Sequence, residues 1–327
     1  MNIGLQITKN KEKYNHLLDL LISNNKTLKN LNFIFIEDEE ALKKEMKSLD
    51  ALVCYEINEE AFSNRTDSLK WIHFGVAGVD KSLFQDIIKS KVVLTNASGI
   101  HAGPVSEFVM SNILYFSKQF DACYDFKSHK EWRQWNIAKQ MVQLKNKTVG
   151  IIGFGCIGKA IAKKAKAFNM NVIAVRRLQK KEENKKTIDR LLPMDKIDEL
   201  YKQSDYIVIA CPLTKLTHHL IGKDEFKKMK QEAIIINIAR GQIINELDLI
   251  IALKNKTIYA AALDVFEKEP LSPTSDLFKL KNVFLSPHIS GNFPEYQLDM
   301  MLQFGKNLTR YVAGKSVFNR ICKKRLY

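Results

Sequence analysis

The chain has 327 residues, of which 46% are hydrophobic and 27% charged, and its formal net charge at pH 7 is +15. This length predicts two domains or one large one, and no run of about 18 apolar residues occurs, so no transmembrane helix is expected. The basic residues are spread along the chain, and the densest cluster, at 180–186, also holds acidic residues. This pattern favours a lysine-rich surface over a nucleic-acid-binding one.

The amino-terminal segment, 1–8, has the pattern of a first strand and lacks the basic start and long apolar stretch of a signal peptide. The five cysteines are widely spaced, odd in number and without a C-x-x-C pair. This usage favours free thiols in a reducing compartment over a disulfide scaffold or a zinc site. We therefore expect a cytoplasmic protein without a metal site.

The first hundred residues alternate short apolar runs with helical patterns. Strands are expected at 3–8, 33–36, 51–54, 71–74 and 92–95. Helical stretches lie between several of them, for example at 13–23 and 39–47. This alternation predicts an α/β domain.

A long helix is expected at 104–118, with a proline near its first turn. We place this helix in a second domain, as the first crossing between the two, and expect the last helix, at about 297–312, to return to the first domain. The smaller domain then comprises residues 1–98 completed by 291–327, and the larger one residues 99–290. Hinges near Ser98 and Gly291 would favour closure over a ligand.

The most informative motif follows a buried-strand run at 148–152. Glycines recur there at G-x-G-x-x-G spacing, and an amphipathic helical stretch begins at once. The first glycine makes the tight turn, the second lets backbone approach a pyrophosphate, and the third lets helix and strand pack closely. The motif predicts a dinucleotide site, with a plain glycine turn as the alternative. Its residues are Gly153, Phe154, Gly155, Cys156, Ile157 and Gly158.

Further strands are expected after this motif, and they are apolar on both faces, as parallel strands covered by helices on both sides are. With the first, they are six: 148–152, 172–175, 206–210, 233–238, 261–265 and 283–286. They predict a doubly wound dinucleotide-binding domain.

The strand at 172–175 ends in Arg176 and Arg177, with no carboxylate at its tip. An acidic residue there would hold the ribose hydroxyls of NAD, whereas two guanidinium groups can bind the extra phosphate of NADP. This pattern predicts a preference for NADP(H), with looser use of NAD(H) as the alternative.

Three polar blocks follow later strands, and they contain Arg240, Glu269 and His288. Ligands of open α/β sheets bind beyond the carboxyl ends of strands, so these side chains are expected at the rim where a nicotinamide ring would lie. Taken singly, each has a structural or surface explanation. Their joint occurrence behind a dinucleotide motif favours a catalytic one.

These blocks, with the glycine motif, 212–217 and 75–80, resemble the D-isomer-specific 2-hydroxyacid dehydrogenase family, which includes glyoxylate/hydroxypyruvate reductases. The resemblance implies a Rossmann cofactor domain, a discontinuous flavodoxin-like substrate domain, both doubly wound with parallel sheets, and a homodimer formed through 99–145, including Trp132 and Trp135. It implies that Arg240, Glu269 and His288 are the catalytic trio. It also implies that the amides of Val76, Ala77 and Gly78 bind the substrate carboxylate and that cofactor contacts include Cys211, Pro212, Thr217, Ile238, Ala239, Asp264 and Gly291.

The residue types suit reduction of a small 2-keto acid to the D-2-hydroxy acid. Arg240 can grip the carboxylate and polarise the ketone, His288 can donate a proton to the ketone oxygen, and Glu269 can orient the imidazole. Glyoxylate and hydroxypyruvate are the first candidates. Structural or surface roles are expected for His101, His218 and His219, and Tyr55 is a candidate contact for the substrate side chain.

A second class of function is a cofactor-sensing binding protein without turnover, because transcriptional corepressors are similar to this family. The +15 charge leaves a nucleic-acid partner conceivable. Corepressors usually carry extra tails, which are not expected in this chain. An enzyme acting on a small molecule, without a nucleic-acid or membrane partner, is therefore the favoured interpretation.

Overall fold

The computed structural model describes residues 1–185 and 187–324, and the chain divides into two compact units. Unit 1 joins Met1–Ile100 to the chain from Phe293 onward, and unit 2 spans His101–Asn292. Within the described residues, no helix is both long and apolar enough to cross a membrane.

Unit 1 is built on a five-stranded parallel sheet with strand order β2-β1-β3-β4-β5. This is the flavodoxin-like order. Its helices and strands are β1 (Asn2–Gln6), α1 (Lys11–Asn24), η1 (Lys26–Leu28), β2 (Asn32–Phe35), α2 (Glu39–Glu45), β3 (Ala51–Cys54), α3 (Glu59–Ser63), β4 (Trp71–Phe74), η2 (Asp80–Ser82), α4 (Gln85–Lys89), β5 (Val93–Asn96) and α12 (Tyr296–Val312).

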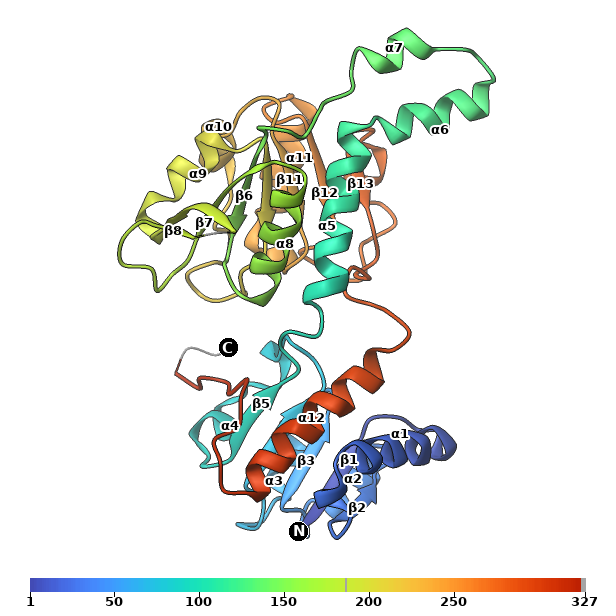
Figure 1. The fold of residues 1–327 in the computed structure, drawn as a ribbon, viewed down its shortest axis with the longest axis vertical. Helices are drawn as coiled ribbons and strands as arrows, with labels where there is room; N and C mark the ends of the chain where they lie inside the picture. Colours follow the sequence, from blue (N-terminus) through green and yellow to red (C-terminus); the bar gives the residue numbers. More distant parts are fainter. Residues whose placement is uncertain (186, 325–327) are drawn as a thin grey trace. The chain divides into compact units, whose positions relative to one another are not determined.

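Both faces of this sheet are buried, because helices cover each of them (Figure 1). Along β3, Leu52 and Cys54 face the core beneath α2, α3 and α4. Ala51 and Val53 face the opposite core, beneath α1 and α12. Strand residues point alternately to the two faces, so a strand buried on both sides must be apolar throughout.

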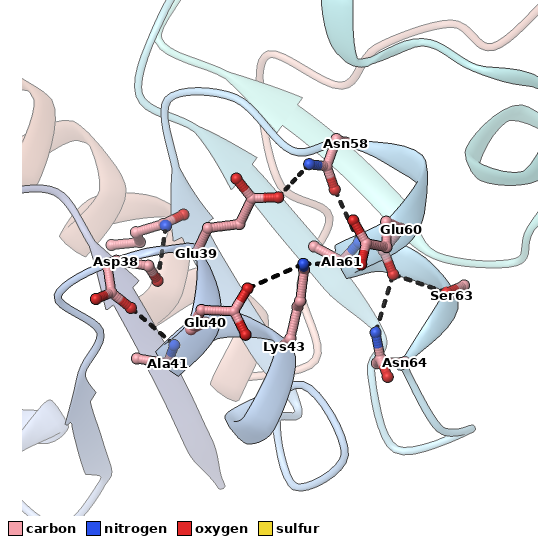
Figure 2. Close-up of polar contacts among 11 residues, drawn as sticks. Asp38, Glu39, Glu40, Ala41, Lys43, Asn58, Glu60, Ala61, Ser63 and Asn64 are labelled. Atoms are coloured by element: carbon pink, nitrogen blue, oxygen red, sulfur yellow. Dashed lines mark hydrogen bonds and ion pairs between the residues drawn. The ribbon is translucent and has the colours of Figure 1, made fainter.

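Two short helices of unit 1 begin at side chains that cap them. Asp38 and Asn58 each accept a hydrogen bond, 2.8 Å long, from the amide three residues further on. Lys43 of α2 then pairs with both Glu40 and Glu60, which ties α2 to α3 (Figure 2). The carboxylates are well exposed, so this network orders the surface and contributes little to folding.

Unit 2 is built on a larger sheet with strand order β13-β12-β11-β10-β6-β7-β9-β8, parallel except for β8. Its helices and strands are α5 (Ala102–Ser117), α6 (Phe120–His129), α7 (Gln134–Ala138), β6 (Thr148–Ile152), α8 (Cys156–Ala167), β7 (Asn171–Val175), β8 (Glu183–Lys185), β9 (Ile188–Leu192), η3 (Met194–Lys196), α9 (Ile197–Gln203), β10 (Tyr206–Ile209), α10 (Lys223–Lys228), β11 (Ile234–Asn237), η4 (Gly241–Ile243), α11 (Glu246–Lys254), β12 (Ala260–Leu263), η5 (Asp276–Lys279) and β13 (Val283–Leu285).

Helices also cover both faces of this sheet (Figure 1). On β10, Ile207 and Ile209 face a core closed by α9, α10 and α11. Tyr206 and Val208 face the core closed by α5 and α8. The two sheets together confirm the predicted fold class of two doubly wound α/β domains.

The expectation of six strands in the second domain is wrong, because β8 and β9 add to the sheet. β9 escapes a search for apolar runs because two charged residues interrupt it. Asp189 accepts hydrogen bonds from Lys166, and Arg190 pairs with Glu182 and Glu199. Helices α6 and α7 are also additional, and they extend from the end of α5 beyond the sheet (Figure 1).

The strand order of unit 2 reverses between β6 and β10. In open α/β sheets, the crevice at the carboxyl ends of the strands on either side of such a switch point is the usual ligand site. The loops after β6, β10, β11, β12 and β13 all leave the sheet at this edge.

Candidate active site

The glycine turn after β6 has the geometry that a dinucleotide needs. Gly153 has φ of +104°, and a Cβ on it would lie 2.7 Å from the backbone of Ala210. A Cβ on Gly158 would lie 2.3 Å from the carbonyl oxygen of Gly153. By contrast, no atom lies within 4 Å of a Cβ placed on Gly155. The turn is closed against the sheet and open at Gly155, so the residues present fit a pyrophosphate beside the first N–H groups of α8.

The residues inside this motif lie at the start of α8. Phe154 is buried, Ile157 is partly buried and Cys156 is exposed.

β7, the neighbour of β6, ends at Val175 and is followed by Arg176 and Arg177, both exposed. The amide of Arg176 donates to Leu192 O at 3.1 Å, which fixes the start of this segment beside β9. The two arginines thus follow the strand next to the glycine turn.

The loop after β10 is closed by Thr217. Its Oγ1 accepts a hydrogen bond from the amide of Thr214 and donates one to Pro212 O, each 2.8 Å long. Cys211, at the start of the loop, is buried, and burial raises the pKa of its thiol to about 12. This cysteine is a neutral packing residue and not a nucleophile.

The turn after β11 holds Arg240 through the side chain of Asn237. The Asn237 amide group donates to Arg240 O at 3.0 Å, and its Oδ1 accepts from the amide of Ala239 at 3.1 Å. The guanidinium Nη1 of Arg240 donates to Ala239 O at 2.8 Å. Ile238 is buried between the turn and the core. Asn237 opens the polar block of the sequence that contains Arg240, but the sequence does not show that its side chain holds the turn.

Glu269 and His288 are in contact. His288 Nδ1 lies 2.8 Å from Glu269 Oε2, while Glu269 Oε1 accepts from the amide of Phe266 at 3.0 Å. The carboxylate is therefore fixed by its own loop and orients the imidazole. With Nδ1 occupied, Nε2 is the ring nitrogen left to exchange a proton with a ligand.

Asp264, which is 1% exposed, fixes the loop that carries His288. Its Oδ1 accepts from Ser286 Oγ and from the amide of Ile289, and its Oδ2 accepts from the amide of Ser290. The carbonyl of Asp264 also accepts from the amide of His288. These bonds keep His288 at φ of +53°, a conformation that few residues other than glycine adopt.

The next residues along this loop are held by His101, at the start of unit 2. The carbonyl of Gly291 lies 3.1 Å from His101 Nδ1. Burial lowers the pKa of His101, so its ring is neutral at pH 7. The structural role expected for His101 stays a prediction, and this contact supports it.

The loops of Arg240, Glu269 and His288 follow β11, β12 and β13, which are neighbours in that order. A Cβ on Gly241 would lie 1.8 Å from the backbone of Phe266, so only glycine lets these two loops meet. The structure thus joins Glu269 to His288 directly and packs the Arg240 turn against the Glu269 loop.

In unit 1, the turn after β4 presents unpaired amides. Asn96 Nδ2 donates to Ala77 O at 2.7 Å, and the amide of Ala97 donates to Val76 O. No group in the described part of the chain accepts from the amides of residues 76–78. Free amides in a turn are the donors that an anion-binding nest uses.

Three aromatic or amide side chains lie at the same edge of unit 1. Tyr55 Oη accepts from Gln297 Nε2 at 2.8 Å, and Tyr296 Oη donates to Gly75 O. Tyr296 and Gln297 carry no signal in the sequence beyond their place at the start of the last helix.

Unit 2 carries a glycine turn after β6 and a histidine–carboxylate pair in the loops after β12 and β13, at the same end of one sheet. This combination in a doubly wound domain is typical of dinucleotide-dependent oxidoreductases. The model of the D-isomer specific 2-hydroxyacid dehydrogenase NAD-binding domain matches residues 110–290, more than half of the chain. The chain belongs to this family, as the sequence motifs predict.

Comparisons over most of the chain agree with this assignment. A glyoxylate reductase from Thermococcus gammatolerans is 36% identical over 284 residues, 84% of each chain. A D-3-phosphoglycerate dehydrogenase from Archaeoglobus fulgidus is 35% identical over 255 residues, 78% of this chain and 47% of that protein. A family member of known structure from Aeromonas salmonicida has a TM-score of 0.84 and 28% identity, covering 98% of this chain and 99% of its own. The chain is an oxidoreductase of small 2-keto and 2-hydroxy acids with a nicotinamide cofactor.

Proposed function

We propose that this enzyme reduces glyoxylate, hydroxypyruvate or a similar small 2-keto acid to the D-2-hydroxy acid, with NADP(H) as the preferred coenzyme. The observation that carries the proposal is the contact of 2.8 Å between Glu269 and His288, one loop away from the Arg240 turn. The identity of 36% to a glyoxylate reductase favours these substrates.

The three side chains take separate roles in this proposal. Arg240 holds the substrate carboxylate and polarises the ketone, because a guanidinium offers a planar fork of donors and a permanent charge. His288 donates its Nε2 proton to the ketone oxygen and recovers a proton from solvent. Glu269 holds the ring in one orientation through Nδ1. The nicotinamide, when bound, supplies the hydride.

We also propose that the turn at residues 76–78 of unit 1 binds a substrate carboxylate through its backbone amides. The amides of Val76, Ala77 and Gly78 have no acceptor among the described residues, which supports this role. Tyr55 is proposed to contact the substrate side chain.

The proposed coenzyme site starts from the glycine turn and the first turn of α8. Arg176 and Arg177 would bind the 2′-phosphate of NADP, and the absence of a carboxylate at the tip of β7 supports this, with NAD(H) as the weaker alternative. The other proposed contacts are Phe154, Cys156, Ile157, Cys211, Pro212, Thr217, Ile238, Ala239, Asp264 and Gly291.

We also propose a cytoplasmic homodimer. Within the described residues, no disulfide joins the five cysteines, which suits a reducing compartment. Large aromatic side chains on and between α6 and α7 are exposed in the single chain, which suits burial against a second copy.

The test is turnover of the purified chain with a panel of 2-keto acids and with NADPH or NADH. We expect oxidation of NADPH by glyoxylate or hydroxypyruvate, and a fall in kcat of about a thousandfold for His288→Gln, since a positioned acid contributes about 10²–10⁴. The kcat/KM for NADPH should exceed that for NADH. The ratio of kcat/KM for NADPH to kcat/KM for NADH should fall toward one in Arg176→Ser/Arg177→Ser. It should stay at the wild-type value in the surface control Lys180→Ser.

Equal or better use of NADH would refute the phosphate site alone. No turnover across the panel would refute the reductase, and salt-dependent DNA binding by the same preparation would then support the corepressor-like alternative.

A further inference from the structure

We propose that His219 and Glu267 form a positioning pair, which fixes the catalytic carboxylate of Glu269 to the loop that follows β10. The inference rests on the proposed function, because it assigns a role toward the Glu269–His288 pair. Neither residue is among the candidate catalytic or cofactor-binding groups.

Glu267 is held through its side chain, its amide and its carbonyl. Its carboxylate contacts His219 Nε2. Its amide donates to Glu246 Oε2 at 3.2 Å, and its carbonyl accepts from Gln242 Nε2 at 2.8 Å. The partners come from three places in the chain: the loop after β10, the turn after β11 and the start of α11. Residue 267 is therefore an anchor for the whole loop after β12.

This anchor lies two residues from the catalytic carboxylate. Oε1 of Glu269 accepts a hydrogen bond from the amide of Phe266, the residue before Glu267, and Oε2 contacts His288 Nδ1. A shift of the backbone at Glu267 must therefore move the carboxylate that orients the imidazole. Displacing a reacting group by about 1 Å can cost a hundredfold in rate.

The other end of the pair belongs to the loop that we assign to the coenzyme. His219 has φ of +48°, and its amide donates to Gln242 O at 2.8 Å. Two residues earlier, Thr217 closes the loop through its bonds to Thr214 and Pro212. The His219 ring thus projects from a hydrogen-bonded loop and contacts Glu267 in the loop that carries Glu269. We infer that the pair transmits the position of the coenzyme loop to the catalytic pair.

The pair is poorly placed to stabilise the fold. The two side chains are 36% and 35% exposed, and ion pairs of this exposure contribute little to folding. A role in placing Glu269 and a role in stability therefore predict different results. If the pair places Glu269, its loss lowers the rate of the chemical step and leaves the melting temperature almost unchanged. If the pair stabilises the fold, its loss lowers the melting temperature.

The experiment compares His219→Leu, His219→Gln and Glu267→Leu, and the double variant His219→Leu/Glu267→Leu, with wild type. His218→Leu is the matched control, since His218 is the neighbouring ring, with its centroid 4.1 Å from that of His219. The readouts are kcat and KM with glyoxylate and NADPH, the Kd for NADPH, the isotope effect with deuterated NADPH, and Tm.

We expect kcat to fall about tenfold in His219→Leu, with KM and the Kd for NADPH within about twofold of wild type, because only the placement of Glu269 changes. The isotope effect should rise, since the hydride step becomes slower than product release. His219→Gln should recover most of kcat, because its Nε2 can still donate to Glu267. The double variant should be no worse than the worse single one, as members of one unit are not additive.

The positioning role is refuted if wild type turns over and His219→Leu keeps the wild-type kcat. It is also refuted if kcat falls as far in His218→Leu as in His219→Leu. It is also refuted if kcat falls together with Tm or with NADPH binding, or if His219→Gln fails to recover activity. A wild-type enzyme without turnover would instead overturn the proposed function, and this assignment with it.

Discussion

His73 is a histidine of β4 with no exposed surface, and it takes no part in the chemistry proposed for the enzyme. Its Nδ1 lies 2.8 Å from Thr95 Oγ1, which also accepts from Trp71 Nε1 at 2.8 Å. Its Nε2 is buried and has no hydrogen-bond partner within the residues that the structure describes. Burial lowers the pKa of His73 to about 3, so the folded protein keeps this ring neutral well below pH 6.

This residue should make the stability of unit 1 sensitive to acid. The folded pKa lies below the unfolded one, so between about pH 6.5 and 3 the unfolded chain binds a proton that the folded chain does not. The contribution of the neutral His73 ring to the free energy of unfolding is therefore fully present above pH 6.5. It falls by about 1.4 kcal/mol for each pH unit below that. Denaturant unfolding of wild type and His73→Phe between pH 4 and 8 measures this.

In His73→Phe the free energy of unfolding should fall less steeply toward pH 4 than in wild type. The surface variant His129→Gln is the control and should follow the wild-type curve, because its side chain is 57% exposed. Parallel curves for wild type and His73→Phe would contradict the prediction.

At the scale of residues, the sequence predicted the catalytic candidates because each follows a strand of one sheet and so reaches a common edge. It could not predict how these candidates are held in place: Asp264 was expected only as a cofactor contact, and Glu267 was not singled out. Asp264 clamps the His288 loop across 22–26 residues of sequence, and His219 meets Glu267 across 48. Such pairs depend on how loops lie in space, which spacing along the chain does not encode.

At the scale of elements, the glycine motif separates a packing role from a ligand-binding one. Gly153→Ala must place a Cβ 2.7 Å from the backbone of Ala210 in a residue with φ of +104°, so we expect loss of folding stability by about 2 kcal/mol or more. Gly155→Ala meets no atom within 4 Å, so stability should be kept. Its methyl group would occupy the space proposed for the pyrophosphate, so the Kd for NADPH should rise about tenfold or more.

Thermal melting and NADPH titration of the two variants check this difference. A stable Gly155→Ala that binds NADPH as wild type does would contradict the assignment of the open side of the turn to the coenzyme. A fully stable Gly153→Ala would contradict the close approach to Ala210.

Strands of this fold were predictable where burial on both faces forces an unbroken apolar run, as in β6, β10 and β11. β9 escaped because charged residues interrupt its apolar run: Asp189 pairs with Lys166, and Arg190 pairs with Glu182 and Glu199. Helix α6 has no buried residue, so it packs no apolar face against the sheet of unit 2. Prediction from pattern thus depends on burial and fails where the chain stays at the surface.

At the scale of the whole molecule, apolar surface is concentrated on one segment of unit 2. Large apolar side chains that are exposed on and around α6 and α7 are Phe120, Tyr124, Trp132, Trp135 and Met141. Trp132 and Trp135 are 82% and 69% exposed. Single chains rarely leave such side chains together in water, and aromatic residues are enriched where chains associate.

The proposed homodimer should therefore depend on these two tryptophans. Wild type should elute in size-exclusion chromatography with light scattering at twice the mass of the chain, and Trp132→Ser/Trp135→Ser should shift to the monomer at micromolar concentration. Removing central aromatic side chains commonly costs 2 kcal/mol or more of association free energy each, about 30-fold in Kd. Leu247→Ser is the control, since Leu247 is 72% exposed on α11, and it should remain dimeric. A monomeric wild type would contradict the proposed homodimer. A dimer that survives the loss of both tryptophans would contradict the assignment of its interface to this segment.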